Sequence, residues 1–228
     1  MAGCVGSVKR VVQVLCKEGL QTTFIGHPLT TLLKTHQRSY DPHGPLILLP
    51  GSRTKELDVF IPLFQDLLDH HPELKDQGLV IPTISPHEDR IRQAFKSHKA
   101  HIVTQTQKYT SMAKGRLALA ASGTTCLELG LLGIPMIVGY KVNPLTAFLI
   151  KKLLYTKDVC LINIILNKNI VPELLQKTCT ADSFYQEIIK KEWTTQLHHL
   201  PLLRNQLIAN KDAAVLVAET IIQQMGHL

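Results

Sequence analysis

Short apolar runs alternate along this chain with longer segments in which apolar residues recur every three or four positions. Largely apolar runs occupy residues 46–49, 79–81, 101–103, 117–120 and 136–139. Runs this short are typical of strands that are buried on both faces of a parallel sheet. Apolar residues at positions 57, 60, 61, 64, 67 and 68 have helical spacing instead. We therefore predict five strands with helices between them, one helix over the latter segment and one over residues 88–97.

This alternation predicts an α/β protein, with a Rossmann-like parallel sheet covered by helices on both faces and a helical C-terminal extension. We assign the sheet domain to residues 42–200 and a C-terminal helix to residues 201–228. From Pro172 onward we expect the chain to be helical. Residues 1–41 end in a polar stretch, and they look like the remnant of an N-terminal domain followed by a linker.

The fourth apolar run ends in the turn Ser122-Gly123-Thr124, after which a second apolar segment begins at once. Gly123 permits a sharp turn, and we expect Thr124 or Thr125 to cap the next helix with a side-chain oxygen. Unpaired N–H groups at the start of a helix favour an anion. The turn therefore predicts a phosphate site, and Glu128, one helical turn further on, is placed to accept hydrogen bonds from a sugar hydroxyl.

A second turn with anion-binding chemistry follows the first apolar run, at Gly51-Ser52-Arg53. Glycine lets the backbone approach a ligand closely, and an arginine side chain can donate two parallel hydrogen bonds to a phosphate. In an open α/β sheet, ligands bind at the carboxyl ends of the strands, where both turns lie. We therefore predict that a diphosphate bridges the two turns.

The charge of the chain fits a phosphate-bearing ligand. Lys and Arg together number 25 against 18 Asp and Glu, which gives a formal net charge of +7. Such a balance suits phosphate ligands, nucleic acid or an anionic membrane surface. The basic residues are scattered, aromatic residues are only 5% of the chain, and no nucleic-acid-binding motif appears, so we expect no nucleic acid partner.

The cysteines, histidines and glycines exclude several other classes of site. The five cysteines are widely spaced and contain no Cys-x-x-Cys pair, which favours a reducing compartment and argues against structural zinc. No His-Glu-x-x-His motif is present, so we expect no metal site and no cofactor. Neither glycine pattern typical of ATP or dinucleotide sites occurs. Polar and turn residues interrupt the apolar stretch over residues 117–140, which therefore does not predict a membrane span.

Several of these motifs occur together in one known family. Their order and spacing resemble those of lipid-A-disaccharide synthases over nearly the whole chain. The segments that carry the resemblance are residues 24–29, 48–53 with Glu56, 120–128, 135–141, 163–165 and 172–176.

The resemblance implies a glycosyltransferase with a B-type fold of two Rossmann-like domains, of which this chain is similar to the C-terminal, donor-binding half. Such enzymes join UDP-2,3-diacylglucosamine to a lipid monosaccharide phosphate acceptor, 2,3-diacylglucosamine 1-phosphate, in lipid A biosynthesis. By this resemblance the general base belongs to an N-terminal half that the chain lacks, so no catalytic residue is assigned in this chain. The isolated chain is expected to be inactive if that half is required.

The resemblance also implies roles for individual residues of the UDP site. Residues that would bind the diphosphate are Arg53 and the backbone amides of Ser122, Gly123 and Thr124, beside Gly51 and Ser52. Glu128 would hold the ribose hydroxyls, and the Gly139-Tyr140 backbone would lie near the uracil. Asn163, Glu173 and Gln176 would line the donor pocket.

Two alternatives stay open on the sequence alone. One is a non-catalytic UDP-sugar-binding fragment, and the other is an isomerase similar to UDP-N-acetylglucosamine 2-epimerase, which uses a related donor half. The family works in the cytoplasm on lipid substrates. We therefore expect a cytoplasmic protein in which an apolar helix over residues 145–154, with Lys151 and Lys152, is a candidate for peripheral contact with the inner face of the cytoplasmic membrane. The sequence does not indicate an oligomeric state.

Overall fold

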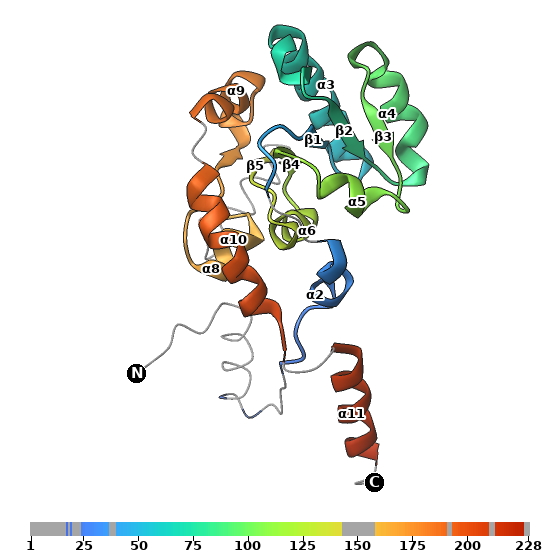
Figure 1. Ribbon diagram of the computed structural model, residues 1–228, viewed down its shortest axis with the longest axis vertical. Helices are drawn as coiled ribbons and strands as arrows, with labels where there is room; N and C mark the ends of the chain where they lie inside the picture. Colours follow the sequence, from blue (N-terminus) through green and yellow to red (C-terminus); the bar gives the residue numbers. More distant parts are fainter. Residues whose placement is uncertain are drawn as a thin grey trace.

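Six parallel strands form one sheet in the computed structural model, which describes residues 17, 19, 24–36, 40–142, 158–190, 193–209 and 213–225 (Figure 1). The order across the sheet is β3-β2-β1-β4-β5-β6. The bounds are β1 Leu46–Leu49, β2 Leu79–Pro82, β3 His101–Val103, β4 Leu117–Ala121, β5 Met136–Tyr140 and β6 Glu173–Leu175. All five predicted strands are confirmed, and so is the Rossmann-like α/β class.

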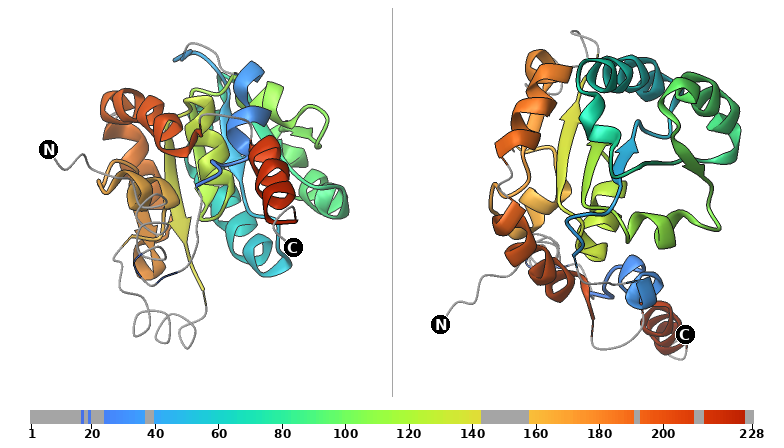
Figure 2. Two further views of the ribbon diagram at one scale, coloured as in Figure 1. Left: turned by 90° about the horizontal axis from the view of Figure 1, so that it is seen from below. Right: turned by 45° about the horizontal axis from the view of Figure 1, so that its top comes forward.

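Helices cover both faces of the sheet because successive strand residues point to opposite sides (Figure 2). On one face, Ile47 and Leu49 of β1 pack into an apolar cluster with α2, α5, α6, α8 and α10. On the other face, Leu46 and Leu48 of β1 pack into a cluster with α3, α4 and α9. The bounds are α2 Leu29–Leu32, α3 Thr54–His70, α4 Glu88–Ala94, α5 Lys108–Met112, α6 Thr125–Leu132, α8 Leu161–Leu166, α9 Ala181–Lys190 and α10 Trp193–Leu207. Short 3-10 turns are η1 Lys34–His36, η2 Pro72–Lys75, η3 Ser85–His87, η4 Lys96–His98 and η5 Gln176–Thr178.

The prediction of helix from Pro172 onward was wrong over β6. Glu173–Leu175 pairs in parallel with β5 and extends the sheet by one strand. Three residues are too short for a periodic signal, and only the pairing with β5 fixes their conformation. The rest of the extension is helical, with α9, α10 and α11 Ala213–Met225.

Residues 24–36 pack against the C-terminal end of α10. The His27 N–H donates to the Leu207 carbonyl at 2.8 Å, and Arg204 Nη2 donates to the Thr30 carbonyl at 2.7 Å. Residues 24–36 are thus attached to the domain, and α10 crosses residue 200, where we expected the sheet domain to end. Helix α11 lies beyond α2, away from the sheet (Figure 1).

The helix expected over residues 145–154 lies outside the described residues, so the membrane contact stays a prediction. Among the helices that the structure does describe, none combines the length and the apolar character that crossing a bilayer requires.

A glutamine on α10 completes the hydrogen bonding of β5. The edge of β5 that faces β6 is paired only from Val138 onward, so Met136 has no strand partner on that side. Gln196, which is buried, donates from Nε2 to the Met136 carbonyl and accepts from the Met136 N–H through Oε1, both at 2.9 Å. One side chain therefore replaces a missing strand residue.

We predict that Gln196→Leu lowers the free energy of unfolding by roughly 2–4 kcal/mol, because two buried backbone groups each lose a partner at about 1–3 kcal/mol. Urea unfolding followed by circular dichroism measures this change. Asn205→Leu on the exposed side of the same helix is the matched control and should change the stability little. Equal stability of the two variants would show that Met136 does not depend on Gln196.

Candidate functional site

The chain order reverses in the middle of the sheet, and a pocket lies at that point. Because all six described strands are parallel, their carboxyl ends share one edge, and β1 pairs with β4 between the two halves of the sheet. The segments that follow two such neighbouring strands run in opposite directions across the sheet, and a crevice opens between them at that edge. The pocket in this crevice has a volume of about 450 Å³, with walls from the ends of β1, β2 and β4 and from α5 and α6.

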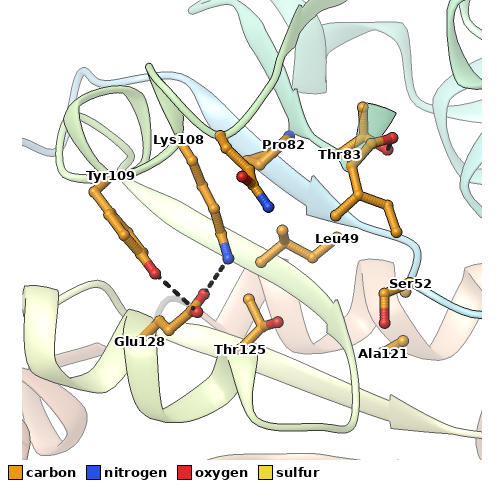
Figure 3. A pocket seen from close by; sticks show the side chains of 12 residues that line it. Leu49, Ser52, Pro82, Thr83, Lys108, Tyr109, Ala121, Thr125 and Glu128 are labelled. Atoms are coloured by element: carbon orange, nitrogen blue, oxygen red, sulfur yellow. Dashed lines mark hydrogen bonds and ion pairs between the residues drawn. The ribbon is translucent and has the colours of Figure 1, made fainter. Parts of the chain in front are cut away.

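The polar centre of this pocket is the carboxylate of Glu128 on α6 (Figure 3). Lys108 Nζ lies 2.6 Å from Glu128 Oε2, and the Tyr109 hydroxyl donates to Oε1 at 3.2 Å. The side chains of Glu128 and Lys108 are only 12% and 22% exposed, so the ion pair is largely removed from water. Apolar residues such as Leu49, Pro82 and Ala121 form the neighbouring wall. The pocket therefore presents a charge-compensated carboxylate to a ligand.

Tyr109 reaches Glu128 because α5 begins directly after β3 and its loop. The ring packs against the apolar cluster on that face of the sheet and meets the His36 ring edge-on, with centroids 5.8 Å apart. Burial, followed by the charge of Glu128 and the hydrogen bond to it, raises the pKa of Tyr109 to about 12. Tyr109 is therefore a hydroxyl donor at neutral pH.

The turn after β4 offers free backbone donors but differs from the prediction in its capping. Thr124 has helical backbone angles of φ −62° and ψ −24° and makes no side-chain cap, and Thr125 is already the first helical residue. The expected threonine cap was therefore wrong, because an N-cap residue needs an extended backbone to reach the helix N–H groups. The N–H groups of Thr124 and Thr125 have no acceptor among the described residues, whereas the Gly123 N–H donates to the buried Cys126 thiol.

Ser122 is engaged in the fold. Its N–H donates to the Gly139 carbonyl at 2.8 Å and its hydroxyl to the Val159 carbonyl at 3.3 Å. The Thr124 amide remains available to an anion, the Gly123 amide has only the weak acceptor Cys126 Sγ, and the Ser122 amide is already bonded to a carbonyl.

The turn after β1 is organised by Glu56. Its Oε2 accepts from the Ser52 N–H at 2.9 Å and the Arg53 N–H at 3.2 Å. Its Oε1 lies 3.0 Å from Arg53 Nη1. Gly51 has φ +107°, and a side chain there would collide with Glu56. The Ser52 and Arg53 amides are thus occupied, while the Arg53 side chain is 83% exposed and, among the described residues, pairs with Glu56 alone.

Gly139 and Tyr140 lie on β5 and do not line the pocket. A Cβ at Gly139 would lie 2.7 Å from Phe60 and 2.9 Å from Phe184, so glycine lets α3 and α9 approach the sheet. The Gly139 carbonyl accepts a hydrogen bond from the Ser122 N–H, so this carbonyl is used in the pairing of β4 with β5. A uracil contact at this backbone stays a prediction.

Asn163 and Glu173 form a hydrogen-bonded network inside the fold. Asn163 Oδ1 accepts from the Ile170 and Val171 N–H groups, and its Nδ2 donates to Glu173 Oε1 at 2.8 Å and to the Val171 carbonyl. Glu173 also accepts from the Val159 and Cys160 N–H groups. This network fixes the chain on both sides of α8, and neither side chain lines the pocket.

Gln176 lies at the carboxyl end of β6, with φ +52°, and it too lies outside the pocket. Of the twelve residues predicted for the site, the pocket brings together Gly51, Ser52 and Glu128. It adds residues that the prediction missed, chiefly Lys108, Tyr109 and Thr125. Their position in the sequence could have indicated them, since Lys108 and Tyr109 follow the third predicted strand and so lie near the ligand-binding edge of the sheet.

Asn163→Ala is predicted to lower the free energy of unfolding by roughly 2–4 kcal/mol, because several buried hydrogen-bonding groups lose their partner at once. Urea denaturation measures the change. Asn169→Ala, at an exposed neighbour that accepts only a 3.3 Å hydrogen bond from Asn163, should leave the stability nearly unchanged. A small effect of Asn163→Ala would contradict the structural role of the network.

Glu128→Gln is predicted to lower the pKa of Tyr109 from about 12 but to leave it above 10.0, because burial, the largest cause of the shift, remains. Ultraviolet titration of the tyrosines measures this pKa. Subtracting the titration curve of the Tyr109→Phe variant isolates the contribution of Tyr109. No change in the titration would show that the two side chains do not interact in solution.

Comparison with known proteins identifies relatives over most of the chain. A family model described as lipid-A-disaccharide synthetase matches residues 12–215. The lipid-A-disaccharide synthase of Gluconobacter oxydans is 34% identical over 190 residues, which is 76% of this chain and 45% of the relative. That of Vibrio campbellii is 38% identical over 149 residues, covering 63% of this chain and 39% of the relative. The chain spans about half the length of the curated relatives it matches.

The solved structures agree on the fold. A crystal structure from Listeria monocytogenes, whose description names UDP-N-acetylglucosamine 2-epimerase, superposes with a TM-score of 0.52 at 14% identity. The match covers 96% of this chain and 59% of that one. At this identity the likeness concerns the fold alone.

Proposed function

This chain belongs to the lipid-A-disaccharide synthetase family, and from that premise we propose that its sheet domain binds the donor UDP-2,3-diacylglucosamine for glycosyl transfer. The observation that carries the proposal is the Glu128 carboxylate in the pocket between β1 and β4, next to the free N–H groups at the start of α6. A carboxylate accepts hydrogen bonds from sugar hydroxyls, and a helix start binds phosphate.

The nucleoside occupies the pocket in this proposal. Its volume of about 450 Å³ lies within the ordinary range for small-ligand sites of roughly 300–1,000 Å³. Lys108 and Glu128 cancel each other in charge, which suits an uncharged base and ribose better than a phosphate. Apolar residues at the ends of β1 and β2 offer a surface against the base.

The diphosphate lies at the rim, on the Gly123 and Thr124 amides and on Arg53. An exposed ion pair contributes about 0–1 kcal/mol, so Arg53 can leave Glu56 for a diphosphate at small cost. Glu56 stays bonded to the turn amides and keeps the turn in shape. As the glycosidic bond breaks, negative charge grows on the departing UDP, and these fixed donors stabilise that charge.

The acceptor, 2,3-diacylglucosamine 1-phosphate, and the general base belong in this proposal to the part of the family that the chain does not match. The epimerase alternative has only a likeness of fold in its favour, and a fold hosts many functions. The family match favours the synthase.

Calorimetric titration of the purified chain with UDP and with uridine tests the donor site. We expect both to bind, and we expect Arg53→Ala to weaken UDP binding about tenfold, the effect of one lost charge-assisted hydrogen bond, without changing uridine binding. Glu128→Ala should weaken both. Arg92→Ala is the matched control, since Arg92 makes an exposed ion pair with Glu88 that lies away from the pocket.

No UDP binding by the wild type, or binding that Arg53→Ala and Glu128→Ala leave unchanged, would defeat the assignment. An assay for disaccharide formation with both lipid substrates then separates the two remaining readings. Product formation by the chain alone marks an enzyme, and UDP binding without product marks a donor-binding module.

A further inference from the structure

Lys108 is the feature of the pocket that neither the sequence motifs nor the family resemblance explains. It is the first residue of α5, whereas its partner Glu128 lies on α6, so the ion pair joins two elements across the pocket wall. Among the described residues it is also the one lysine or arginine that lines the pocket. Figure 3 shows its ammonium group and the Tyr109 hydroxyl converging on the same carboxylate.

We propose that Lys108, assisted by Tyr109, is a positioning residue that holds the Glu128 carboxylate ready for the vicinal hydroxyls of a ribose. The inference rests on the function proposed above and deepens it, because it names the residue that positions the ribose-binding carboxylate. Lys108 then acts through Glu128 and does not touch the phosphates.

The burial of the carboxylate requires such a partner. With a side chain only 12% exposed, Glu128 lacks most of the hydration that stabilises a charge. An uncompensated buried charge is strongly destabilising, and it is relieved when a close countercharge is present. Lys108 supplies that countercharge at 2.6 Å. A carboxylate without it would be pulled toward solvent and away from the ligand.

The hydrogen bonding of the carboxylate leaves acceptor capacity on Oε1. An ionised carboxylate has about four acceptor sites. Tyr109 uses one site on Oε1, while Oε2 is buried and lies 2.6 Å from the Lys108 ammonium group. Lys108 thus anchors Oε2, and Oε1 keeps the acceptor capacity that ribose hydroxyls require.

The position of Lys108 argues against direct phosphate binding. Its side chain is 22% exposed and its ammonium group is committed to Glu128, whereas Arg53 is 83% exposed at the rim. The amides of Gly123 and Thr124 do not line the pocket. The charged part of a nucleotide is therefore expected outside the space that Lys108 faces.

The test compares uridine, 2′-deoxyuridine and UDP binding to wild type, Lys108→Met and Lys108→Arg by calorimetry. We expect Lys108→Met to weaken uridine and UDP binding by the same factor, about tenfold for a misplaced charged acceptor, and Lys108→Arg to restore most of it. The wild type should bind 2′-deoxyuridine, which lacks one of the two hydroxyls, more weakly than uridine. Lys108→Met should therefore weaken 2′-deoxyuridine binding by a smaller factor than uridine binding. Arg92→Ala serves again as the control for a lost ion pair elsewhere.

A double-mutant cycle with Glu128→Gln completes the test. Because Lys108 acts through Glu128, Lys108→Met should have little further effect on uridine binding once Glu128 is glutamine. The double variant buries no charge, so it remains informative if Lys108→Met alone fails to fold. A loss confined to UDP, or a full effect of Lys108→Met in the Glu128→Gln background, overturns the inference while the donor site stands. Wild type that binds neither uridine nor UDP overturns both.

Discussion

The parallel pairing of β1 with β4 is the constraint on which the rest of this molecule depends. Leu46 to Leu49 run beside Leu117 to Ala120 in register, although they lie far apart along the chain. This pairing places the turn after β1 and the start of α6 at one edge of the sheet. Without it, Ser52 and Glu128 would not line the same pocket. A shift of the register by one residue would also exchange the two buried faces of β1.

Three glutamates in this part of the molecule bind neighbouring donors, and they do so in different ways. Glu56 folds back on its own turn, so its carboxylate fixes the backbone and leaves Arg53 at the surface. Glu128 is fixed by Lys108 and Tyr109 from another helix, and it lines the pocket. Glu173, the first residue of β6, bonds to Val159, Cys160 and Asn163 and holds the segments on both sides of α8. Similar side chains therefore have distinct tasks, which their partners decide.

The sequence was sufficient for the elements whose burial is local and regular. The run at residues 46–49 and the helical spacing after it appear as β1 and α3, because four buried residues and an amphipathic stripe leave a clear periodic signal. The three residues of β6 carried no such signal, since their conformation depends on β5. The threonine cap failed for a related reason. Local preference favours a capping side chain after a turn, but the backbone of Thr124 is already helical.

The same distinction separates the parts of the site that could and could not be predicted. Motif spacing located Gly51, Ser52 and Glu128. It could not show that the Asn163 side chain forms its hydrogen bonds with backbone groups of the fold. It also could not show that Lys108 and Tyr109 contact Glu128, because these contacts join separate elements in space. Because Lys108 and Glu128 neutralise each other, the pocket has a lower net positive charge than a site built from unpaired cations would have. A neutral interior of this kind suits an uncharged, hydroxyl-bearing part of a ligand, as the donor proposed above has.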